Sequence, residues 1–274
     1  MRRKVGLLLV VGLLAGMLAA CSRGDTKEAS KGATANAQGG NVKKIIVGTG
    51  TQFPNVCFID ANGKLTGYDV ELVKELDKRL PEYEFEFKTM EFSSLLLSLE
   101  TGKIDFVAHQ MEKNPEREAK YLFNKEPYSI FLNKVVVPKT NTDIKSIDDL
   151  KGKKILTSAT SNEAYILQEY NKEHDNAIDI VYTNAPSNDR TNQILTGRVA
   201  GTVSTDFALK YMPNGDKLKT VGEALTQSDV LFVLRKDEQE LSDKLDQAIK
   251  EVKADGTLSK LSVQWLGEDF TKSK

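Results

Sequence analysis

Few side chains in this sequence are suited to nucleophilic or metal chemistry. There are two cysteines, Cys21 and Cys57, and two histidines, His109 and His174. The histidines lie far apart, and neither has a cysteine or a second histidine at the spacing of metal ligands. We therefore expect no metal site, no histidine-based catalytic site and no cofactor. Cys57 lies in an apolar run, which predicts a buried structural thiol; a reactive thiol is the alternative.

The other cysteine closes an N-terminal segment typical of secretion. A basic start is followed by residues 5–20, which carry no charge, and by Cys21 directly after small residues. This predicts a signal peptide over residues 1–20, because the apolar run is shorter than the roughly 20 residues of a membrane-spanning helix. The segment resembles the lipobox of bacterial lipoproteins, in which the cysteine is acylated, with palmitate as an expected lipid. An ordinary secreted protein with a chance cysteine is the alternative.

Composition limits the domain organisation and the partners that the rest of the chain can have. Residues 22–41 are rich in small and polar residues and contain no aromatic residue, so residues 21–41 are expected to be a lipidated cysteine and a flexible linker. About 230 residues remain, enough for one large domain or two lobes. Removing residues 1–20 leaves 35 Lys and Arg against 39 Asp and Glu, without a basic stripe. We therefore expect no nucleic-acid partner, and we expect a monomer.

Short apolar segments alternate with amphipathic ones in the first half of the chain. The predicted elements are a strand over 44–48, a helix over 68–80, a strand over 84–88, a helix over 93–100 and a strand over 104–108. A serine is expected to cap the second helix, and Gly102 to end it. This alternation predicts a parallel sheet with crossover helices on its faces.

The same pattern then starts again. The predicted elements are a short helix over 146–152, a strand over 154–157, a helix over 162–172, a strand over 179–182, a helix over 189–195 and a strand over 199–204. Strands over 133–137 and 230–234 flank this unit, and the tail over 238–270 is helical. The chain is therefore predicted to be α/β with two units of similar size, and a cleft between them would be a ready ligand site.

A motif over residues 63–72, Gly-Lys-Leu-Thr-Gly-Tyr-Asp-Val-Glu-Leu, resembles the signature of the bacterial solute-binding proteins, family 3. These proteins deliver polar amino acids to ABC transporters. Asp77 departs from the pattern, since a small residue is usual there. Asp69 and Glu71 fall in the first turn of the predicted helix, where negative charge favours the helix dipole, so a structural role is expected. Matching segments at 101–105, 115–117, 146–153 and 255–258 extend the resemblance over nearly the whole mature chain.

The resemblance implies a two-lobed, type II periplasmic-binding-protein-like fold. Each lobe would be a mainly parallel sheet with flanking helices, and the ligand would bind in the cleft between the lobes. Residues 42–131 and 228–274 would form lobe 1, and residues 132–227 lobe 2. The expected partners are an amino acid, an ABC transporter permease and the outer face of the cell membrane. Residues 109–114 and 157–162 resemble the L-cystine-binding members of low-GC Gram-positive bacteria more narrowly; another polar amino acid is the alternative ligand.

The carboxylate of an amino acid is best held by a guanidinium and by N–H groups at a helix start. Asn114 and Pro115 are expected as N-cap and first residue of a helix that carries Arg117. In the family an arginine at this position clamps the ligand carboxylate; from the residues alone, a solvated helix arginine is the alternative. The family also places a polar loop of lobe 2 against the carboxylate, here formed by Ser158, Thr160, Ser161 and Asn162. An ordinary strand-to-helix turn is its alternative.

The ammonium group of a bound amino acid needs a carboxylate, because an unpaired buried charge costs several kcal/mol. Most relatives use an aspartate just after the strand matched by 199–204, a position occupied here by Thr205 with Asp206 next to it. Glu112 stands where relatives commonly have a small hydroxyl residue. We expect Glu112 as the first candidate and Asp206 as the second; each could instead be a solvated acid.

Aromatic and amide side chains complete the expected site. Phe53 and Phe92 align with family positions whose rings flank the ligand, although both could belong to the core. Gln52 and Gln110 could bond a second polar end, which suits cystine with its two amino-acid groups.

Two other classes of function compete with solute binding. Dehydratases share this fold, and Glu112 could serve as their acid, but no second catalytic group is evident. A sensory module is disfavoured because no signalling segment follows residue 270. We expect a binding protein and not an enzyme; conversion of the bound molecule on incubation would indicate the opposite.

Overall fold

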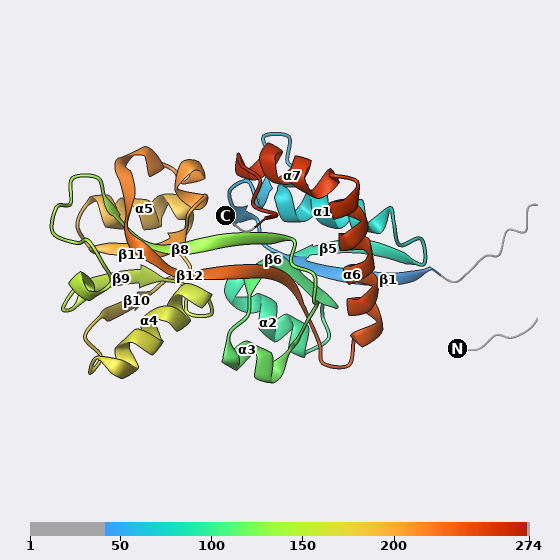
Figure 1. The fold of residues 1–274 in the computed structure, drawn as a ribbon, viewed down its shortest axis with the longest axis horizontal. Coiled ribbons are helices and arrows are strands. Elements are labelled where there is room, and N and C mark those ends of the chain that lie inside the picture. The colour runs from blue at the N-terminus through green and yellow to red at the C-terminus, as the bar shows by residue number, and fades with distance from the viewer. Residues whose placement is uncertain (1–41, 273–274) are drawn as a thin grey trace, which may run out of the picture. The chain divides into compact units, whose positions relative to one another are not determined.

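A computed structural model describes residues 42–272 of the chain, and its main feature is a nine-stranded sheet (Figure 1). The order is β10-β9-β11-β8-β12-β6-β1-β5, with β7 paired to β12. These strands are β1 (Lys43–Thr49), β5 (Tyr83–Thr89), β6 (Phe106–Glu112), β7 (Leu122–Phe123), β8 (Ser129–Pro138), β9 (Lys154–Thr157), β10 (Asp179–Tyr182), β11 (Gly201–Thr205) and β12 (Leu218–Leu234). A small antiparallel sheet contains β2 (Gln52–Phe53), β3 (Cys57–Ile59) and β4 (Leu65–Thr66).

Seven α-helices accompany the strands within the described residues. They are α1 (Tyr68–Asp77), α2 (Phe92–Glu100), α3 (Pro115–Lys120), α4 (Asn162–Glu173), α5 (Ser187–Leu195), α6 (Gln239–Ala254) and α7 (Thr257–Leu266). Short 3₁₀ turns lie at Asp148–Leu150, Ala208–Tyr211 and Gly215–Lys217. None of the helices in this part of the chain is long and apolar enough to cross a membrane. The predicted signal peptide, lipidation site and linker lie outside the described residues.

Two parallel sets of strands make up the ends of the large sheet. In one set β1 pairs in parallel with β5 and β6, and in the other β9 pairs in parallel with β10 and β11. The predicted crossover arrangement is therefore confirmed. β8 and β12 join the sets, because β12 runs antiparallel to both β6 and β8, and β8 runs antiparallel to β11. The two strands predicted over 133–137 and 230–234 are longer in the structure, where they are β8 and β12. β12 continues past its bulge near Gly222 into polar sequence.

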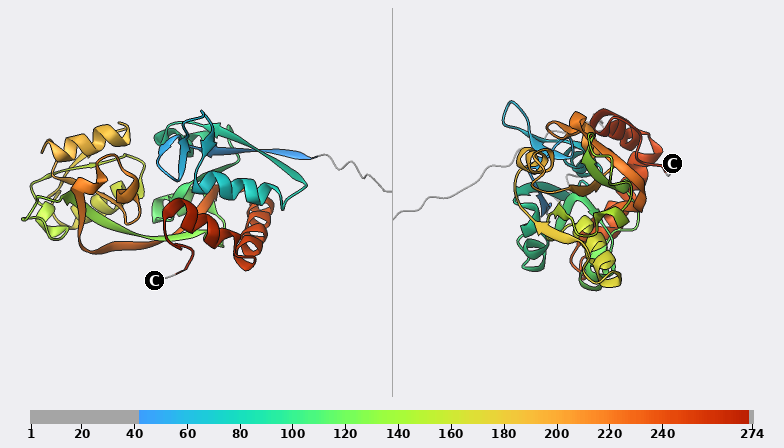
Figure 2. Two further views of the ribbon diagram at one scale, coloured as in Figure 1. Left: turned by 90° about the horizontal axis from the view of Figure 1, so that it is seen from above. Right: turned by 90° about the vertical axis from the view of Figure 1, so that its left-hand side faces the viewer.

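Helices cover both faces of each parallel set, as Figures 1 and 2 show. Successive residues of a strand point to opposite faces. In β6, Phe106 packs with α1, α6 and α7, while its neighbour Val107 packs with α2. In β9, Ile155 packs in the cluster that contains Leu167 of α4, while Leu156 packs with Ile194 of α5. The apolar runs of these strands are thus explained by burial on both sides.

Two local predictions needed correction, and a third is confirmed. The N-cap of α2 is Glu91, and no side chain caps this helix, so the predicted serine cap is wrong. The predicted helical tail is interrupted at Gly256, whose φ of 78° lies in the left-handed region that favours glycine. Cys57 is fully buried, as its apolar run predicted, and burial raises the pKa of its thiol to about 12.

Candidate functional site

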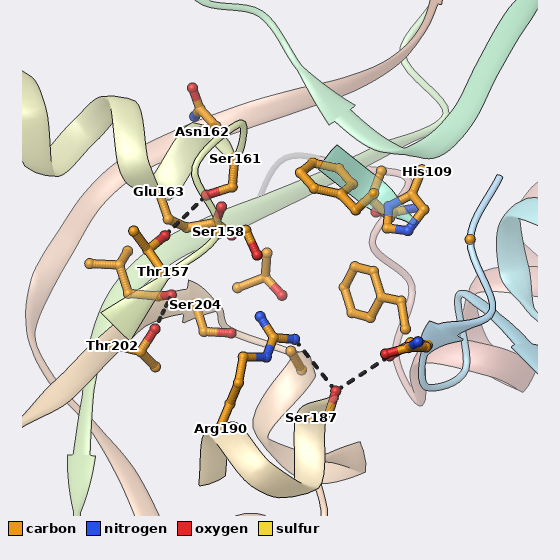
Figure 3. A pocket seen from close by; sticks show the side chains of 18 of the residues that line it. His109, Thr157, Ser158, Ser161, Asn162, Glu163, Ser187, Arg190, Thr202 and Ser204 are labelled. Atoms are coloured by element: carbon orange, nitrogen blue, oxygen red, sulfur yellow. Dashed lines mark hydrogen bonds between the residues drawn. The ribbon is translucent and has the colours of Figure 1, made fainter. Parts of the chain in front are cut away.

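A cavity lies at the carboxyl ends of strands from both parallel sets (Figure 3). Residues 50–54 follow β1, residues 109–112 end β6, residues 156–158 end β9, and residues 202–205 end β11. The starts of α2, α4 and α5 also contribute to its lining. The outer edge beyond the carboxyl ends of parallel strands is the usual ligand site of α/β sheets. The topology therefore brings together segments that are far apart in the sequence.

Ten of the twelve predicted ligand-binding residues line this cavity. They are Gln52, Phe53, Phe92, Gln110, Glu112, Arg117, Ser158, Ser161, Asn162 and Thr205. Thr160 and Asp206 are not among the lining residues. Thr160 instead uses its backbone carbonyl to accept a hydrogen bond from Arg117, and one carboxylate oxygen of Asp206 lies 3.3 Å from the backbone N of Leu132.

Arg117 is held in place by the start of α3. The Asn114 side chain accepts a hydrogen bond from the backbone N–H of Arg117 at 2.9 Å, and Pro115 is the first helical residue, so the predicted cap is confirmed. The buried guanidinium donates from Nη1 to the carbonyl of Glu112 at 2.8 Å and from Nη2 to that of Thr160 at 2.6 Å. Burial lowers the pKa of Arg117, and the nearby charge of Glu112 opposes this effect. Arg117 is thus a fixed cation at the cavity wall.

Glu112 is a buried carboxylate at the end of β6. Its Oε1 accepts hydrogen bonds from the side-chain amides of Asn133 at 2.7 Å and Asn162 at 2.9 Å. Asn162 in turn accepts from the amide of Asn114 at 3.1 Å. Burial is the main reason why the pKa of Glu112 is raised to about 7. A cation at this position in the cavity would favour the charged form.

The start of α4 forms a polar part of the wall. The Ser161 hydroxyl accepts a hydrogen bond from the backbone N–H of Ala164 at 3.1 Å and lies 3.1 Å from the hydroxyl of Thr157. The Ser158 hydroxyl donates to the carbonyl of Thr183 at 3.3 Å. The helix start and its positive dipole end therefore face the cavity, an arrangement suited to a negatively charged group.

Aromatic rings form another part of the wall. The His109 ring lies 5.8 Å from the ring of Phe53 and 4.9 Å from that of Phe92, between centroids. Phe53 also stacks on Phe207 at 6.0 Å. Burial lowers the pKa of His109 to about 4, so the imidazole is neutral at neutral pH. The expected aromatic wall therefore includes a histidine that we had not predicted as a site residue.

Asp69, in the family signature, does more than favour the dipole of α1. This carboxylate is fully buried and accepts hydrogen bonds from the backbone N–H of Gln110 at 2.7 Å, from its side-chain amide at 2.5 Å and from the hydroxyl of Tyr128 at 3.0 Å. Gln110 has a φ of 48°, an uncommon conformation for a residue with a side chain. Asp69 therefore stabilises the shape of β6 where this strand lines the cavity. One side-chain N–H of Gln110 is directed to Asp69, so this donor is not left for a ligand.

Three charged residues of the cavity were missed from the sequence, Glu91 at the N-cap of α2, Glu163 on α4 and Arg190 on α5. Figure 3 shows Arg190 projecting from α5 into the cavity. The spacing could have revealed it, because Arg190 precedes the apolar Ile194 by four residues and so shares its face of the helix. Within residues 42–272, no group of three or more His, Cys, Asp or Glu side chains is placed to hold a metal ion.

Comparison with known proteins agrees with this geometry. Residues 45–268 match the model of the bacterial extracellular solute-binding proteins, family 3. The chain is 48% identical to the L-cystine-binding protein TcyK and 43% identical to the L-cystine-binding protein TcyJ, both of Bacillus subtilis. The alignments cover all of this chain and 100% and 98% of those proteins.

A solved structure described as a putative L-cystine ABC transporter from Listeria monocytogenes is 55% identical, with a TM-score of 0.80. The match covers 84% of this chain and 99% of that one. The predicted α/β fold of the type II periplasmic binding proteins is therefore confirmed. The chain belongs to the bacterial extracellular solute-binding proteins of family 3.

Proposed function

We propose that this protein captures L-cystine outside the cytoplasm and delivers it to an ABC importer. The observation that carries the proposal is that a buried arginine, Arg117, and a buried glutamate, Glu112, line the same cavity. A zwitterionic amino acid needs both signs of charge in this way. The similarity to L-cystine-binding proteins over the full length supports cystine in particular.

Arg117 and the start of α4 would hold one carboxylate of the ligand, and Glu112 its ammonium group. The positive end of α4 and the fixed guanidinium favour a negative group between them. Glu112 is preferred over Asp206 because Glu112 lines the cavity and Asp206 does not. The rings of Phe53 and Phe92 would pack on the apolar middle of the ligand.

Two lobes that close on the ligand are part of the proposal, with residues 42–131 and 228–274 in one lobe and 132–227 in the other. Both lobe boundaries fall inside long strands, β8 and β12, which would act as the hinge. Hydrogen bonds already link the two sets of residues, from Arg117 to Thr160, from Asn162 to Glu112 and from Ser187 to Gln52. Such bonds would stabilise the closed arrangement.

Calorimetry on the purified protein tests the proposal. We expect cystine to bind with a dissociation constant near or below about 1 μM, which is about −8 kcal/mol. Cystine should raise the melting temperature more than cysteine, glutamine, histidine or arginine does. A larger shift with one of those four would replace cystine by that amino acid. Mass spectrometry should recover the ligand unchanged, since we propose no enzymatic role; a converted product would indicate a dehydratase-like enzyme.

We also propose that the protein acts as a monomer, anchored to the outer face of the membrane through lipid on Cys21. The lipobox-like segment and the polar stretch after it support this proposal. Cys21→Ser should move the protein from the membrane fraction to the medium and leave its affinity for cystine unchanged. Retention in the membrane would indicate that residues 5–20 stay as an anchor.

A further inference from the structure

The cavity contains more charge than one amino-acid group requires. Besides Arg117 and Glu112, its lining includes Arg190 and Glu163, together with Glu91, whose side chain is exposed. His109 adds no charge at neutral pH, because its pKa is lowered to about 4. The inner wall thus has two cations and two carboxylates.

Arg190 has no carboxylate partner among the described residues. Its Nη2 lies 3.5 Å from the hydroxyl of Ser187, and that hydroxyl is 3.3 Å from the backbone oxygen of Gln52. The Arg190 side chain is half-buried, and burial lowers its pKa, while the charge of Glu163 opposes this effect. A guanidinium has five N–H donors, so most of those on Arg190 remain available to a bound anion.

Glu163 lies in the first turn of α4, next to Asn162. Its side chain is half-buried and makes no ion pair with any of residues 42–272. Its negative charge acts on both arginines of the cavity, Arg117 and Arg190. A carboxylate in this position suits a cationic group of a ligand.

We infer that Arg190 and Glu163 form a second subsite for an α-amino-acid group, so that the cavity matches a ligand with two such groups. The inference rests on the proposed function, in which Arg117 and Glu112 hold the first group. Arg190 would bind the second carboxylate and Glu163 the second ammonium. A ligand with a single amino-acid group would leave both half-buried side chains without partners in the cavity. Sites with buried polar groups reject ligands that leave them unpaired.

Calorimetry on the full protein with four disulfide or thioether compounds separates the contribution of the second carboxylate from that of the second ammonium group. L-Cystine has two complete amino-acid groups, and S-methyl-L-cysteine has one. The mixed disulfide of cysteine with 3-mercaptopropionate has one complete group and a distant carboxylate. The mixed disulfide of cysteine with cysteamine has one complete group and a distant ammonium.

Arg190→Gln should weaken the binding of cystine and of the mercaptopropionate disulfide by at least about 30-fold, the loss of a charged hydrogen-bond partner. It should change the binding of S-methyl-L-cysteine and of the cysteamine disulfide by less than about threefold. Glu163→Gln should weaken cystine and the cysteamine disulfide and spare the other two. Arg198→Gln, an exposed arginine outside the cavity, is the charge-matched control and should alter none of the four.

Equal weakening of all four ligands by Arg190→Gln, or no weakening of any, would overturn the inference. If Arg190→Gln does not fold, Arg190→Lys gives the same test, since it keeps the charge but loses the planar fork. The loss of affinity caused by Arg190→Lys should again be confined to the ligands with a distant carboxylate. If the wild-type protein binds none of the four compounds, the proposed function itself fails. If it binds them and Arg117→Gln weakens all four while Arg190→Gln weakens none, only the second subsite is refuted.

Discussion

The carboxylate of Asp69 accepts two hydrogen bonds from Gln110, one from its backbone N–H at 2.7 Å and one from its side-chain amide at 2.5 Å. Asp69 belongs to the family signature at the start of α1, and Gln110 belongs to the strand that lines the cavity. The two residues are 41 positions apart. The signature therefore connects directly to the shape of the binding site.

Asp69→Ala should lower the free energy of unfolding by about 3 kcal/mol, because it leaves a buried backbone N–H, a buried amide and the Tyr128 hydroxyl unpaired. Urea unfolding measures the change. Affinity for cystine should fall as well, since Gln110 loses the contact that stabilises its left-handed backbone. Glu71→Ala, at a half-buried position of the same helix, is the control. A comparable loss of stability in both variants would show that Asp69 acts only through the helix dipole.

Arg117→Ala should cost at least about 3 kcal/mol of binding free energy, because the ligand carboxylate would be desolvated without its partner. Calorimetry with cystine measures this loss. The substitution also leaves the carbonyls of Glu112 and Thr160 without a donor, so the melting temperature of the ligand-free variant must be recorded. A folded variant with unchanged affinity would place the carboxylate elsewhere.

Glu112→Gln keeps the size of the side chain and deletes its charge, which tests the ammonium site. If Glu112 is the partner, affinity should fall by an amount similar to that of Arg117→Ala. Asp206→Asn should do little, because Asp206 does not line the cavity. A severe effect of Asp206→Asn with a mild one of Glu112→Gln would support the second-lobe arrangement common among relatives.

Affinity for cystine should depend on pH through Glu112. Its pKa is raised to about 7 in the folded protein, and a bound ammonium group would require the charged form. Affinity should therefore rise about eightfold between pH 6 and pH 7.5, as the free carboxyl loses its proton. Glu112→Gln should remove this dependence. A wild-type affinity that is constant over this range would show that Glu112 does not pair with the ligand.

The raised pKa values of Glu112 and Asp69 also predict how the free energy of unfolding depends on pH. Folding raises the pKa of Glu112 to about 7 and that of Asp69 to about 6, mainly through burial. A carboxyl with a raised pKa binds more protons in the folded state, so these two groups stabilise the ligand-free protein at low pH and lose that contribution as pH rises to about 7. The free energy of unfolding of Glu112→Gln should therefore fall less than that of the wild-type protein between pH 4.5 and pH 7 in urea titrations.

Much of this protein follows from sequence patterns that are local. Burial on both faces produced the continuous apolar run of β9, and the predicted bounds of both β9 and β10 are confirmed. The cap formed by Asn114 and Pro115 was also predictable, because it depends only on the next three residues. The resemblance to the family indicated the fold and most of the ten predicted residues that line the cavity.

Other features of the fold and the site were decided by tertiary structure alone, because they depend on contacts between residues that are distant in the sequence. Glu112 is a buried acid with a raised pKa because packing removes it from water, and its hydrogen-bond donors Asn133 and Asn162 are distant from it in the sequence. The polar half of β12 forms a strand because β8 pairs with it, which its own composition does not indicate. Arg190 enters the cavity because α5 packs on β9 through Ile194 and Leu156, a contact between segments that no local pattern specifies. Local periodicity determines which face of a helix is apolar, but packing determines which cavity its charged residues reach.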